Sequence, residues 1–196
     1  MIILGITGGI ATGKSTVTQM LADLGAPTLS ADALAHDLLA PGTVSTRSVL
    51  NAFPACAEAD GATIDRRALG RLVFADAAAR AQLESLTHPA IIAALRDQIA
   101  LWRSSSEAPA AAAEIPLLFE ANLEWLVDRI VVVTCSEFDQ VSRMLCRDSV
   151  TEAEAHRRIK VQWPLAQKEA HADYLITTDG GMEDTRRQVE DLWKSL

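Results

Sequence analysis

Aromatic residues, cysteines and net positive charge are all scarce in this sequence. Phe, Trp and Tyr make up 5% of the 196 residues, and alanine inflates the hydrophobic fraction of 49%. The three cysteines, Cys56, Cys135 and Cys146, form neither a C-x-x-C pair nor an even set, which excludes a disulfide framework and indicates reduced thiols. With 18 Lys and Arg against 26 Asp and Glu, the net charge of −8 argues against a general nucleic-acid coat protein.

Long apolar runs and signal sequences are missing as well. No stretch approaches the length of a membrane span, and the apolar N-terminus is too short for a signal peptide and lacks a basic region. The four histidines show no metal-ligand spacing. We therefore expect a cytoplasmic protein that contacts neither membrane nor nucleic acid. Its length suits one domain, or one domain with a sizeable insertion.

The order of the apolar segments predicts strands that alternate with helices. The predicted strands are 2–6, 26–31, 129–134 and 174–178. The predicted helices are Gly13 to Gly25, most of 33–103, 136–147, 151–161 and a closing helix after 181, with a linker-like stretch at 104–109. Residues 110–116 are ambiguous, because alanine prefers a helix whereas Pro116 and the overall rhythm favour a strand. This alternation implies an open parallel sheet.

The turn after the first strand carries a phosphate-binding motif. Gly8 to Ser15 fits G-x-x-x-x-G-K-[ST], and the motif follows a strand and opens a helix. The glycines let backbone N–H groups face a phosphate, and the helix N-terminus adds positive potential. Lys14 reaches the β- and γ-phosphates, and the Ser15 hydroxyl ligates Mg²⁺. A plain glycine-rich turn with a surface lysine is the weaker interpretation.

A carboxylate follows the second predicted strand. Asp32 should share the carboxyl edge of the sheet with Lys14, where it could accept a proton from an attacking hydroxyl. Asp is also a favoured N-cap, and Ala33-Leu34-Ala35 begins a helical segment. On sequence alone the N-cap interpretation stands slightly ahead, and the two roles are compatible.

A basic segment lies between residues 143 and 168. Six basic residues face three acidic ones there: Arg143, Arg147, Arg157, Arg158, Lys160 and Lys168 against Asp148, Glu152 and Glu154. Arg143 and Arg147 are four apart and share one helix face. This pattern favours a lid that clamps phosphates over a solvated helix pair with mixed charges.

Several motifs together make the chain resemble the dephospho-coenzyme A kinase family. In chain order they are Thr7–Thr16, Ser30-Ala31-Asp32, Ile64–Leu69 with Val73-Phe74, Leu86–Pro89, Ile115–Glu120, Gln140–Arg143 with Arg147-Asp148, and Ala172-Asp173. The similarity runs in order from residue 2 to about residue 181.

The resemblance implies a three-layer α/β/α phosphate-loop kinase fold with a parallel five-stranded sheet. Residues 1–32, 104–136 and 169–196 would form the nucleotide-binding core, 33–103 a largely helical substrate domain, and 137–168 a lid. The implied reaction transfers the γ-phosphoryl group of ATP, with Mg²⁺, to the 3′-hydroxyl of dephospho-coenzyme A. Lid closure would exclude water.

The resemblance also implies roles for individual residues. The catalytic set is Asp32, Lys14, Arg143 and Arg147. The nucleotide-binding set is Gly8, Gly9, Ile10, Ala11, Thr12, Gly13, Lys14, Ser15 and Thr16, with Ser15 on the metal. The acceptor-binding set is Asp32, Arg66, His88, Pro116, Leu117, Leu118, Phe119 and Glu120. Ordinary interpretations of the acceptor set are a buried wedge at 116–120, a turn at His88-Pro89, and a surface cation at Arg66.

Two alternatives stay open, and three positions depart from the family pattern. The chain could phosphorylate another small hydroxyl acceptor, such as a nucleoside monophosphate or a sugar. It could also be a nucleotide switch, although the N-K-x-D string of guanine-specific switches is absent. Ala11 replaces a usual glycine, and its methyl group is tolerated if φ is negative. Ser30 replaces an Asp, and Thr178 replaces an Asn near the adenine.

Overall fold

The computed structural model describes residues 1–105, 107–148 and 150–196. The chain divides into two compact units, and residues 1–30 with 101–196 form unit 1, whereas residues 31–100 form unit 2. Helix α5 (Ala77–Ser105) extends into the linker expected at 104–109, of which residue 106 lies outside the described part.

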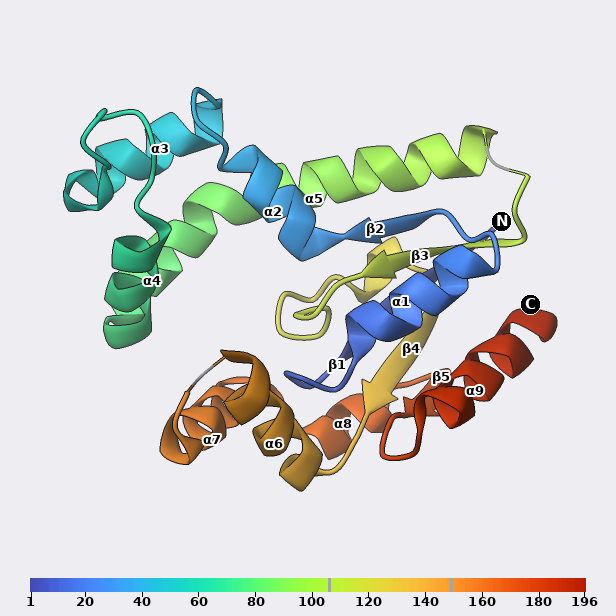
Figure 1. Ribbon diagram of the computed structural model, residues 1–196. Helices are drawn as coiled ribbons and strands as arrows, with labels where there is room; N and C mark the ends of the chain where they lie inside the picture. Colours follow the sequence, from blue (N-terminus) through green and yellow to red (C-terminus); the bar gives the residue numbers. More distant parts are fainter. Residues whose placement is uncertain (106, 149) are drawn as a thin grey trace. The chain divides into compact units, whose positions relative to one another are not determined.

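Unit 1 is built around a parallel five-stranded sheet, as the sequence predicts (Figure 1). The strands are β1 (Ile2–Gly8), β2 (Thr28–Ser30), β3 (Ala110–Glu114), β4 (Arg129–Thr134) and β5 (Tyr174–Thr177). Their order across the sheet is β2-β3-β1-β4-β5. From the neighbouring strands β1 and β3 the chain leaves toward opposite edges of the sheet. Their carboxyl ends therefore form a switch point, the usual place for a ligand in such sheets.

Strand β3 resolves the ambiguous alanine segment. Its residues pair with β1 from Ile2 opposite Ala110 to Ile6 opposite Glu114, and all five are buried. The helix preference of alanine is worth well under 1 kcal/mol per residue. Backbone pairing with strands on both sides outweighs this helix preference. The small side chains of alanine also let helices pack closely on the sheet.

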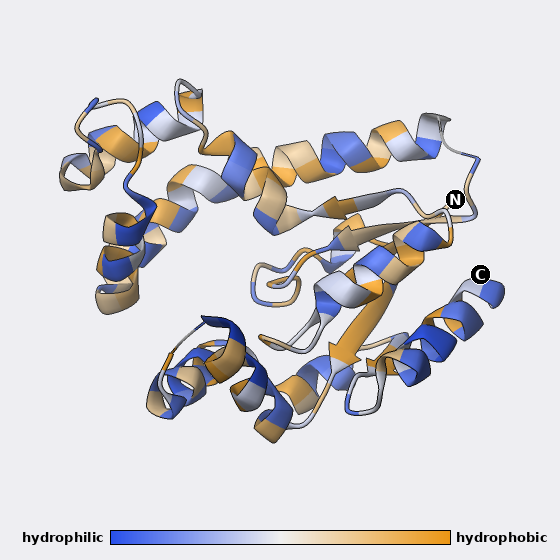
Figure 2. Ribbon diagram, in the orientation of Figure 1, coloured by the Kyte–Doolittle hydropathy of each residue, from blue (hydrophilic) through white to orange (hydrophobic). Residues whose placement is uncertain are grey.

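Helices lie on both faces of the sheet: α1 (Lys14–Asp23) and α9 (Met182–Lys194) on one, and α8 (Leu165–Glu169) against β4 on the other. The other helices of unit 1, α6 (Glu137–Asp148) and α7 (Glu152–Val161), pack on each other and on the loop after β1. Helices α1 and α9 pack on each other and on the face that carries Val131 and Val133. Side chains alternate along a strand, so Thr134 points to the opposite face, where its hydroxyl donates to Glu169 of α8. Figure 2 shows β4 as hydrophobic and α9 as mostly hydrophilic.

Two of the helices in unit 1 begin at the N-caps that the sequence indicates. The Thr151 hydroxyl accepts a hydrogen bond from the N–H of Glu154 at the start of α7. The Ser136 hydroxyl accepts one from the N–H of Asp139 at the start of α6. Each bond satisfies a donor that the helix itself leaves unpaired.

Unit 2 is helical and has its own small core. Its helices are α2 (Ala31–Leu38), α3 (Val44–Ala52), α4 (Arg66–Ala75) and the first part of α5, with a 3₁₀ turn at Pro54–Cys56. Val49, Phe53, Ile64 and Leu69 are buried together in this core. Among the described residues, no helix is both long and apolar enough to cross a membrane.

The packing of β3 generates a stability prediction. Ala112 of β3 is fully buried in the cluster that includes side chains of α1, so Ala112→Leu should lower the free energy of unfolding by about 1–3 kcal/mol through overpacking. The matched control is Ala166→Leu in α8, which places the same side chain at an exposed position. Urea denaturation of both variants tests this, and equal midpoints would contradict the packing described here.

Candidate nucleotide-binding site

The phosphate loop joins β1 to α1 at the switch point of the sheet. Gly8 has φ +146°, and a Cβ there would lie 2.1 Å from the carbonyl oxygen of Val133 in β4, so only glycine fits. A Cβ on Gly9 would lie 2.4 Å from Nε2 of Gln140. Gly13, with φ +93°, turns the chain into α1. The loop therefore packs closely against β4 and α6.

Three successive carbonyl groups of the loop are held by side chains from outside it. The bonds are Gln140 Nε2 to Ile10 O (2.7 Å), Arg143 Nη1 to Ala11 O (3.2 Å) and Thr178 Oγ1 to Thr12 O (2.7 Å). Ile10 also donates its N–H to Oε1 of Gln162, at 2.8 Å, although the sequence places Ile10 among the nucleotide-binding residues. These four hydrogen bonds thus fix the backbone conformation of the loop between Ile10 and Thr12.

Lys14 and Ser15 begin helix α1, as the motif predicts. The Lys14 ammonium is buried and donates to the carbonyl of Gly9, at 2.7 Å. The Ser15 hydroxyl donates to Oε1 of Glu114, at 2.8 Å. Thr16 lies one residue further on and lines a pocket described below.

Glu114 is a candidate functional residue that the sequence reasoning missed. It is the last residue of β3 and its side chain is buried, with only 7% of the residue exposed. The signal was its place directly before Ile115–Glu120, at the carboxyl end of a strand beside β1. Together with Ser15 it offers two oxygen ligands, the type that Mg²⁺ prefers, and Mg²⁺ usually takes few protein ligands and completes its shell with phosphates and water. No group of three or more His, Cys, Asp or Glu that could hold a metal occurs within the described residues.

Ala11 adopts a left-handed backbone conformation, with φ +58°. The condition under which its methyl group would be tolerated, a negative φ, is therefore not met. Such a conformation costs an alanine roughly 1–2 kcal/mol relative to a right-handed one. The carbonyl bond from Arg143 and the packing of Ala11 against α6 and α7 hold it there.

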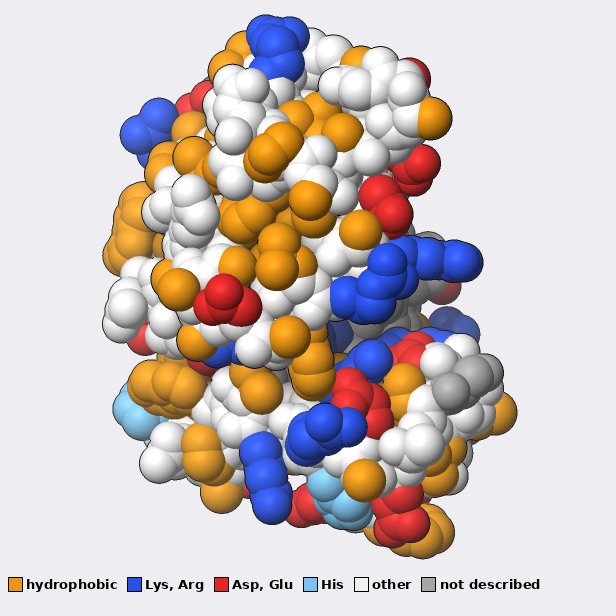
Figure 3. All heavy atoms as spheres, turned by 90° about the vertical axis from the view of Figure 1, so that its left-hand side faces the viewer, with side chains coloured by type: hydrophobic (Ala, Val, Ile, Leu, Met, Phe, Trp, Pro, Cys, Tyr) orange, Lys and Arg blue, Asp and Glu red, His pale blue; other side chains and the backbone are white. Residues whose placement is uncertain are grey.

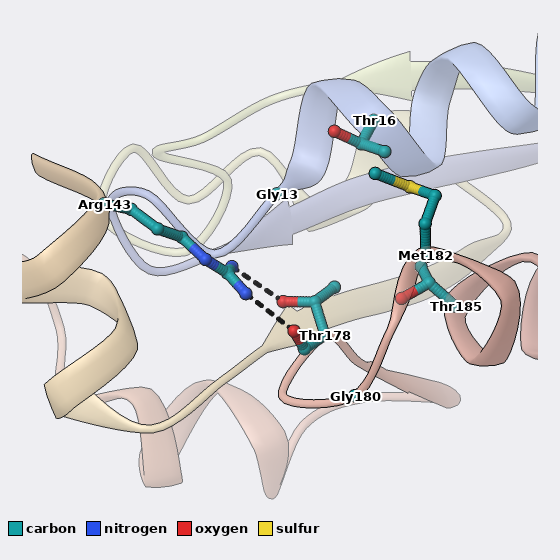
Figure 4. Close-up of a pocket in the computed structure, with 7 residues that line it drawn as sticks. All are labelled: Gly13, Thr16, Arg143, Thr178, Gly180, Met182 and Thr185. Atoms are coloured by element: carbon teal, nitrogen blue, oxygen red, sulfur yellow. Dashed lines mark hydrogen bonds between the residues drawn. The ribbon is translucent and has the colours of Figure 1, made fainter. Parts of the chain in front are cut away.

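A pocket of about 230 Å³ lies beside the loop (Figure 4). Its lining residues are Gly13, Thr16, Arg143, Thr178, Gly180, Met182 and Thr185. Figure 4 shows Met182 reaching from the start of α9 toward Thr16 of α1, and Arg143 bonded to Thr178. The volume is small for a drug-sized ligand and suits a fragment such as a purine ring.

Two groups near this pocket have shifted pKa values. Burial raises the pKa of the Cys135 thiol, whose sulfur lies 3.7 Å from Nη1 of Arg143, so the thiol stays protonated at neutral pH. The backbone N–H of Ser136 donates to Asp179 and lowers the pKa of that carboxyl group, which therefore stays ionised. Asp179 thereby ties the end of β5 to the start of α6.

The two arginines of the predicted clamp have different partners. Arg143 is directed to the loop and donates to Ala11, to the Thr178 hydroxyl and to the Thr178 carbonyl. Arg147 is exposed and pairs with Asp148 at 2.6 Å, which holds the pKa of that carboxyl group below its usual value. Figure 3 shows Lys and Arg side chains interspersed with acidic ones over the lower part of that view, where α6 and α7 lie. One helix face thus carries one anchored arginine and one at the surface.

The segment Pro116–Glu120 follows β3 and is mostly buried. Leu118 and Phe119 are buried, whereas Leu117 is exposed. Phe119 stacks on Trp163 with ring centroids 5.7 Å apart. Pro116 accepts a hydrogen bond from the Thr7 hydroxyl at its carbonyl oxygen. The buried-wedge interpretation therefore describes Leu118 and Phe119.

Lys168 is not part of a solvent-facing basic lid. Its side chain is 0% exposed and lies below the loop, where Nζ is 2.8 Å from Glu120 Oε1. The same ammonium donates to the carbonyls of Gly8 and Pro116. Oε1 of Glu120 also accepts the N–H of Trp163. The sequence analysis placed Lys168 among the basic residues of the lid, whereas its ammonium is bound to Glu120 and to two backbone carbonyls.

Asp32, Arg66 and His88 lie in unit 2. Asp32 is exposed and is the second residue of α2, which begins at Ala31, so the N-cap interpretation is wrong. Arg66 donates to the carbonyls of His36 and Leu39 at the end of α2. His88 is half-buried in α5, which continues through Pro89, so the turn interpretation is wrong as well.

The fold and the loop define the class of the protein. A parallel five-stranded sheet with helices on both faces and a phosphate loop at its switch point is the architecture of phosphate-loop kinases. The family model for dephospho-CoA kinase matches residues 2–184, and the chain belongs to this family.

Relatives and solved structures agree with this assignment. The dephospho-CoA kinase of Geobacter metallireducens is 43% identical over 194 residues, which are 99% of this chain and 96% of that protein. The crystal structure of TT1252 from Thermus thermophilus has a TM-score of 0.84 at 32% identity and covers 100% of this chain and 97% of its own. Dephospho-CoA kinase from Campylobacter jejuni has a TM-score of 0.71 at 27% identity, with coverages of 98% and 96%.

The strain at Ala11 generates the second prediction. Ala11→Gly should raise the free energy of unfolding by up to about 1 kcal/mol, because glycine adopts this conformation without strain. Ala94→Gly, in the middle of α5, is the matched control and should lower it by about 1 kcal/mol. Denaturant unfolding measures both. A loss of stability at both positions would contradict the left-handed conformation of residue 11.

Proposed function

We propose that this chain transfers the γ-phosphoryl group of ATP to the 3′-hydroxyl of dephospho-coenzyme A, giving coenzyme A and ADP. The observation that carries the proposal is the oxygen pair of Ser15 and Glu114 beside an anchored phosphate loop, in a chain that belongs to the dephospho-CoA kinase family. Both lie at the switch point of the sheet, where α/β enzymes bind their ligands.

The nucleotide would bind along the loop. Backbone N–H groups between Gly8 and Thr16, except that of Ile10, which donates to Gln162, and the N-terminal end of α1 attract the phosphates. The Lys14 ammonium neutralises their charge. The pocket at Thr178 and Met182 would take the adenine. Ser15 and Glu114 would hold Mg²⁺, which supplies Lewis-acid neutralisation of the β- and γ-phosphate oxygens when bound.

The acceptor would bind to the residues that the resemblance to the dephospho-coenzyme A kinase family indicates. Asp32 orients the ribose hydroxyl and accepts its proton as the phosphoryl group moves. Arg66, His88 and the segment Pro116–Glu120 contact the acceptor, with residues 33–103 acting as the substrate domain. Arg143 and Arg147, within the lid at 137–168, stabilise negative charge, and closure of the lid excludes water.

The direct test is an ADP-release assay with ATP, Mg²⁺ and a panel of acceptors. We expect fast release with dephospho-coenzyme A and slow release with a nucleoside monophosphate, a sugar or no acceptor. Equal release with all acceptors would refute the proposed substrate. Tight GTP binding with slow hydrolysis and no response to acceptors would refute a kinase.

The role of Asp32 gives the third prediction. Asp32→Asn should lower the maximal rate with dephospho-coenzyme A by roughly 10²–10⁴-fold, the usual effect of a positioned general base. Stability should fall by at most about 1 kcal/mol, because Asp32 is exposed in the first turn of α2 and favours the helix dipole there. Asp37→Asn, in the last turn of the same helix, is the matched control and should keep the parent rate. A rate of Asp32→Asn within about threefold of the parent would exclude the base assignment.

Glu114 gives the fourth prediction. Glu114→Gln keeps an oxygen that accepts the Ser15 hydroxyl proton but loses the carboxylate charge. The concentration of Mg²⁺ needed for half-maximal rate should therefore rise by roughly 10–100-fold. Glu183→Gln, exposed in the first turn of α9, serves as the control. An unchanged Mg²⁺ dependence would remove Glu114 from the metal site.

A further inference from the structure

Two glutamines hold the two polar backbone groups of Ile10 in the phosphate loop. Gln140 of α6 donates from Nε2 to the carbonyl of Ile10, and Gln162, the residue after α7, accepts from its N–H at Oε1. A carbonyl can only accept and an N–H can only donate, so the orientation of both side-chain amides is fixed by their partners. Gln140 is only 4% exposed.

Packing independently ties the loop to the same two helices. The side chains of Ile10 and Ala11 pack against a buried cluster of Val141, Met144 and Ala155 from α6 and α7. The absence of a side chain at Gly9 leaves the space that the Gln140 amide occupies. Loop, α6 and α7 therefore form one packed group within unit 1.

The planarity of the peptide bond gives these contacts a consequence for phosphate binding. The C=O of one residue and the N–H of the next point in opposite directions across a trans peptide. With the Ile10 carbonyl held by Gln140, the Ala11 N–H must point away from α6. With the Ile10 N–H held by Gln162, that group is withdrawn from the set of donors available to a phosphate.

We propose that Gln140 and Gln162 are positioning residues that set the direction of the N–H groups in the phosphate loop and couple them to α6 and α7. Neither glutamine contacts the nucleotide. Their effect reaches it through the backbone of Ile10 and Ala11. This inference rests on the proposed binding of a nucleotide to the loop.

The different roles of the two amides give opposite expectations for the same substitution. Gln140→Glu replaces the donor by a carboxylate oxygen that faces the Ile10 carbonyl, so the contact becomes repulsive. Gln162→Glu keeps an acceptor for the Ile10 N–H. Both variants add one negative charge near the loop, so charge alone predicts equal losses.

The experiment is a titration of the parent and the variants with ADP and with adenosine, which lacks phosphates. Gln140→Glu should bind ADP about tenfold or more weakly, the effect of an unmade buried hydrogen bond, and Gln162→Glu less than about threefold more weakly. Gln162→Met, which cannot accept strongly, should lose about tenfold, because the loop N–H groups then lose their fixed directions, and this outweighs the return of the Ile10 N–H as a donor. Adenosine affinity should stay unchanged in all of them. Gln167→Glu, exposed in α8, is the control for added charge.

Each outcome decides between the roles. Equal losses of ADP affinity in Gln140→Glu and Gln162→Glu, or parallel losses of ADP and adenosine, would overturn the positioning role. If Gln140→Glu fails to fold, the comparison of Gln162→Met with Gln162→Glu still decides, because only the first breaks the bond. A parent that binds ADP but does not phosphorylate dephospho-coenzyme A would refute the proposed function and leave this test intact. A parent that binds no ADP would refute both.

Discussion

The buried ammonium of Lys168 is the interaction on which the geometry of the site depends. It lies below the phosphate loop and joins the Glu120 carboxylate to the carbonyls of Gly8 and Pro116. A charge without solvent is tolerated only when it is paired and hydrogen-bonded. Oε2 of Glu120 is buried without a hydrogen-bond partner among the described residues. The pair therefore compensates a carboxylate that has little other support, and breaking it would cost about 3–5 kcal/mol.

This arrangement connects three segments that lie far apart in the sequence. Gly8 ends β1, Pro116 and Glu120 follow β3, and Lys168 belongs to α8. The switch point lies between the carboxyl ends of β1 and β3. The Lys168 ammonium bonds to the chain at both of these ends, at Gly8 and at Pro116. Side chains from α6 and from the end of β5 donate hydrogen bonds to other carbonyls of the loop. The loop is thus shaped by partners from α6, from α8 and from the end of β5.

The sequence predicted the parts of this site that depend on local order. The phosphate loop had to follow a strand and open a helix, and both elements are present. The apolar run at 129–134 predicted β4 with its observed bounds. In these cases a short stretch of residues contains all the physical information that decides the structure.

Other features depend on residues that are distant in sequence, and local sequence patterns did not predict them. Alanine propensity left 110–116 ambiguous, because the pairing of β3 with β1 and β2 comes from the whole sheet. For the same reason Glu114 was missed, since its importance appears only when β3 lies beside the loop. The burial of Lys168 depends on Glu120 and Pro116, which lie far away in the sequence. The roles of Asp32, Arg66 and His88 stay predictions.

Arg143 and Arg147 show the limit of helical periodicity in the same way. Their spacing of four residues correctly predicts that they share one face of the helix. It does not predict which groups the two side chains bind. Arg143 donates hydrogen bonds to the loop and to the residue after β5, whereas Arg147 forms a salt bridge with the adjacent Asp148.

The acidic composition of the chain is consistent with a phosphate site because the attraction in the loop is local. The net charge of −8 gives no long-range attraction for an anionic ligand. Backbone N–H groups and the N-terminal end of α1 act over a few ångströms, and they act only if their directions are fixed. The carbonyl bonds from Gln140, Arg143 and Thr178 fix them. Neutral and charged side chains share this task, so the site depends on the orientation of peptide groups more than on the number of cations around it.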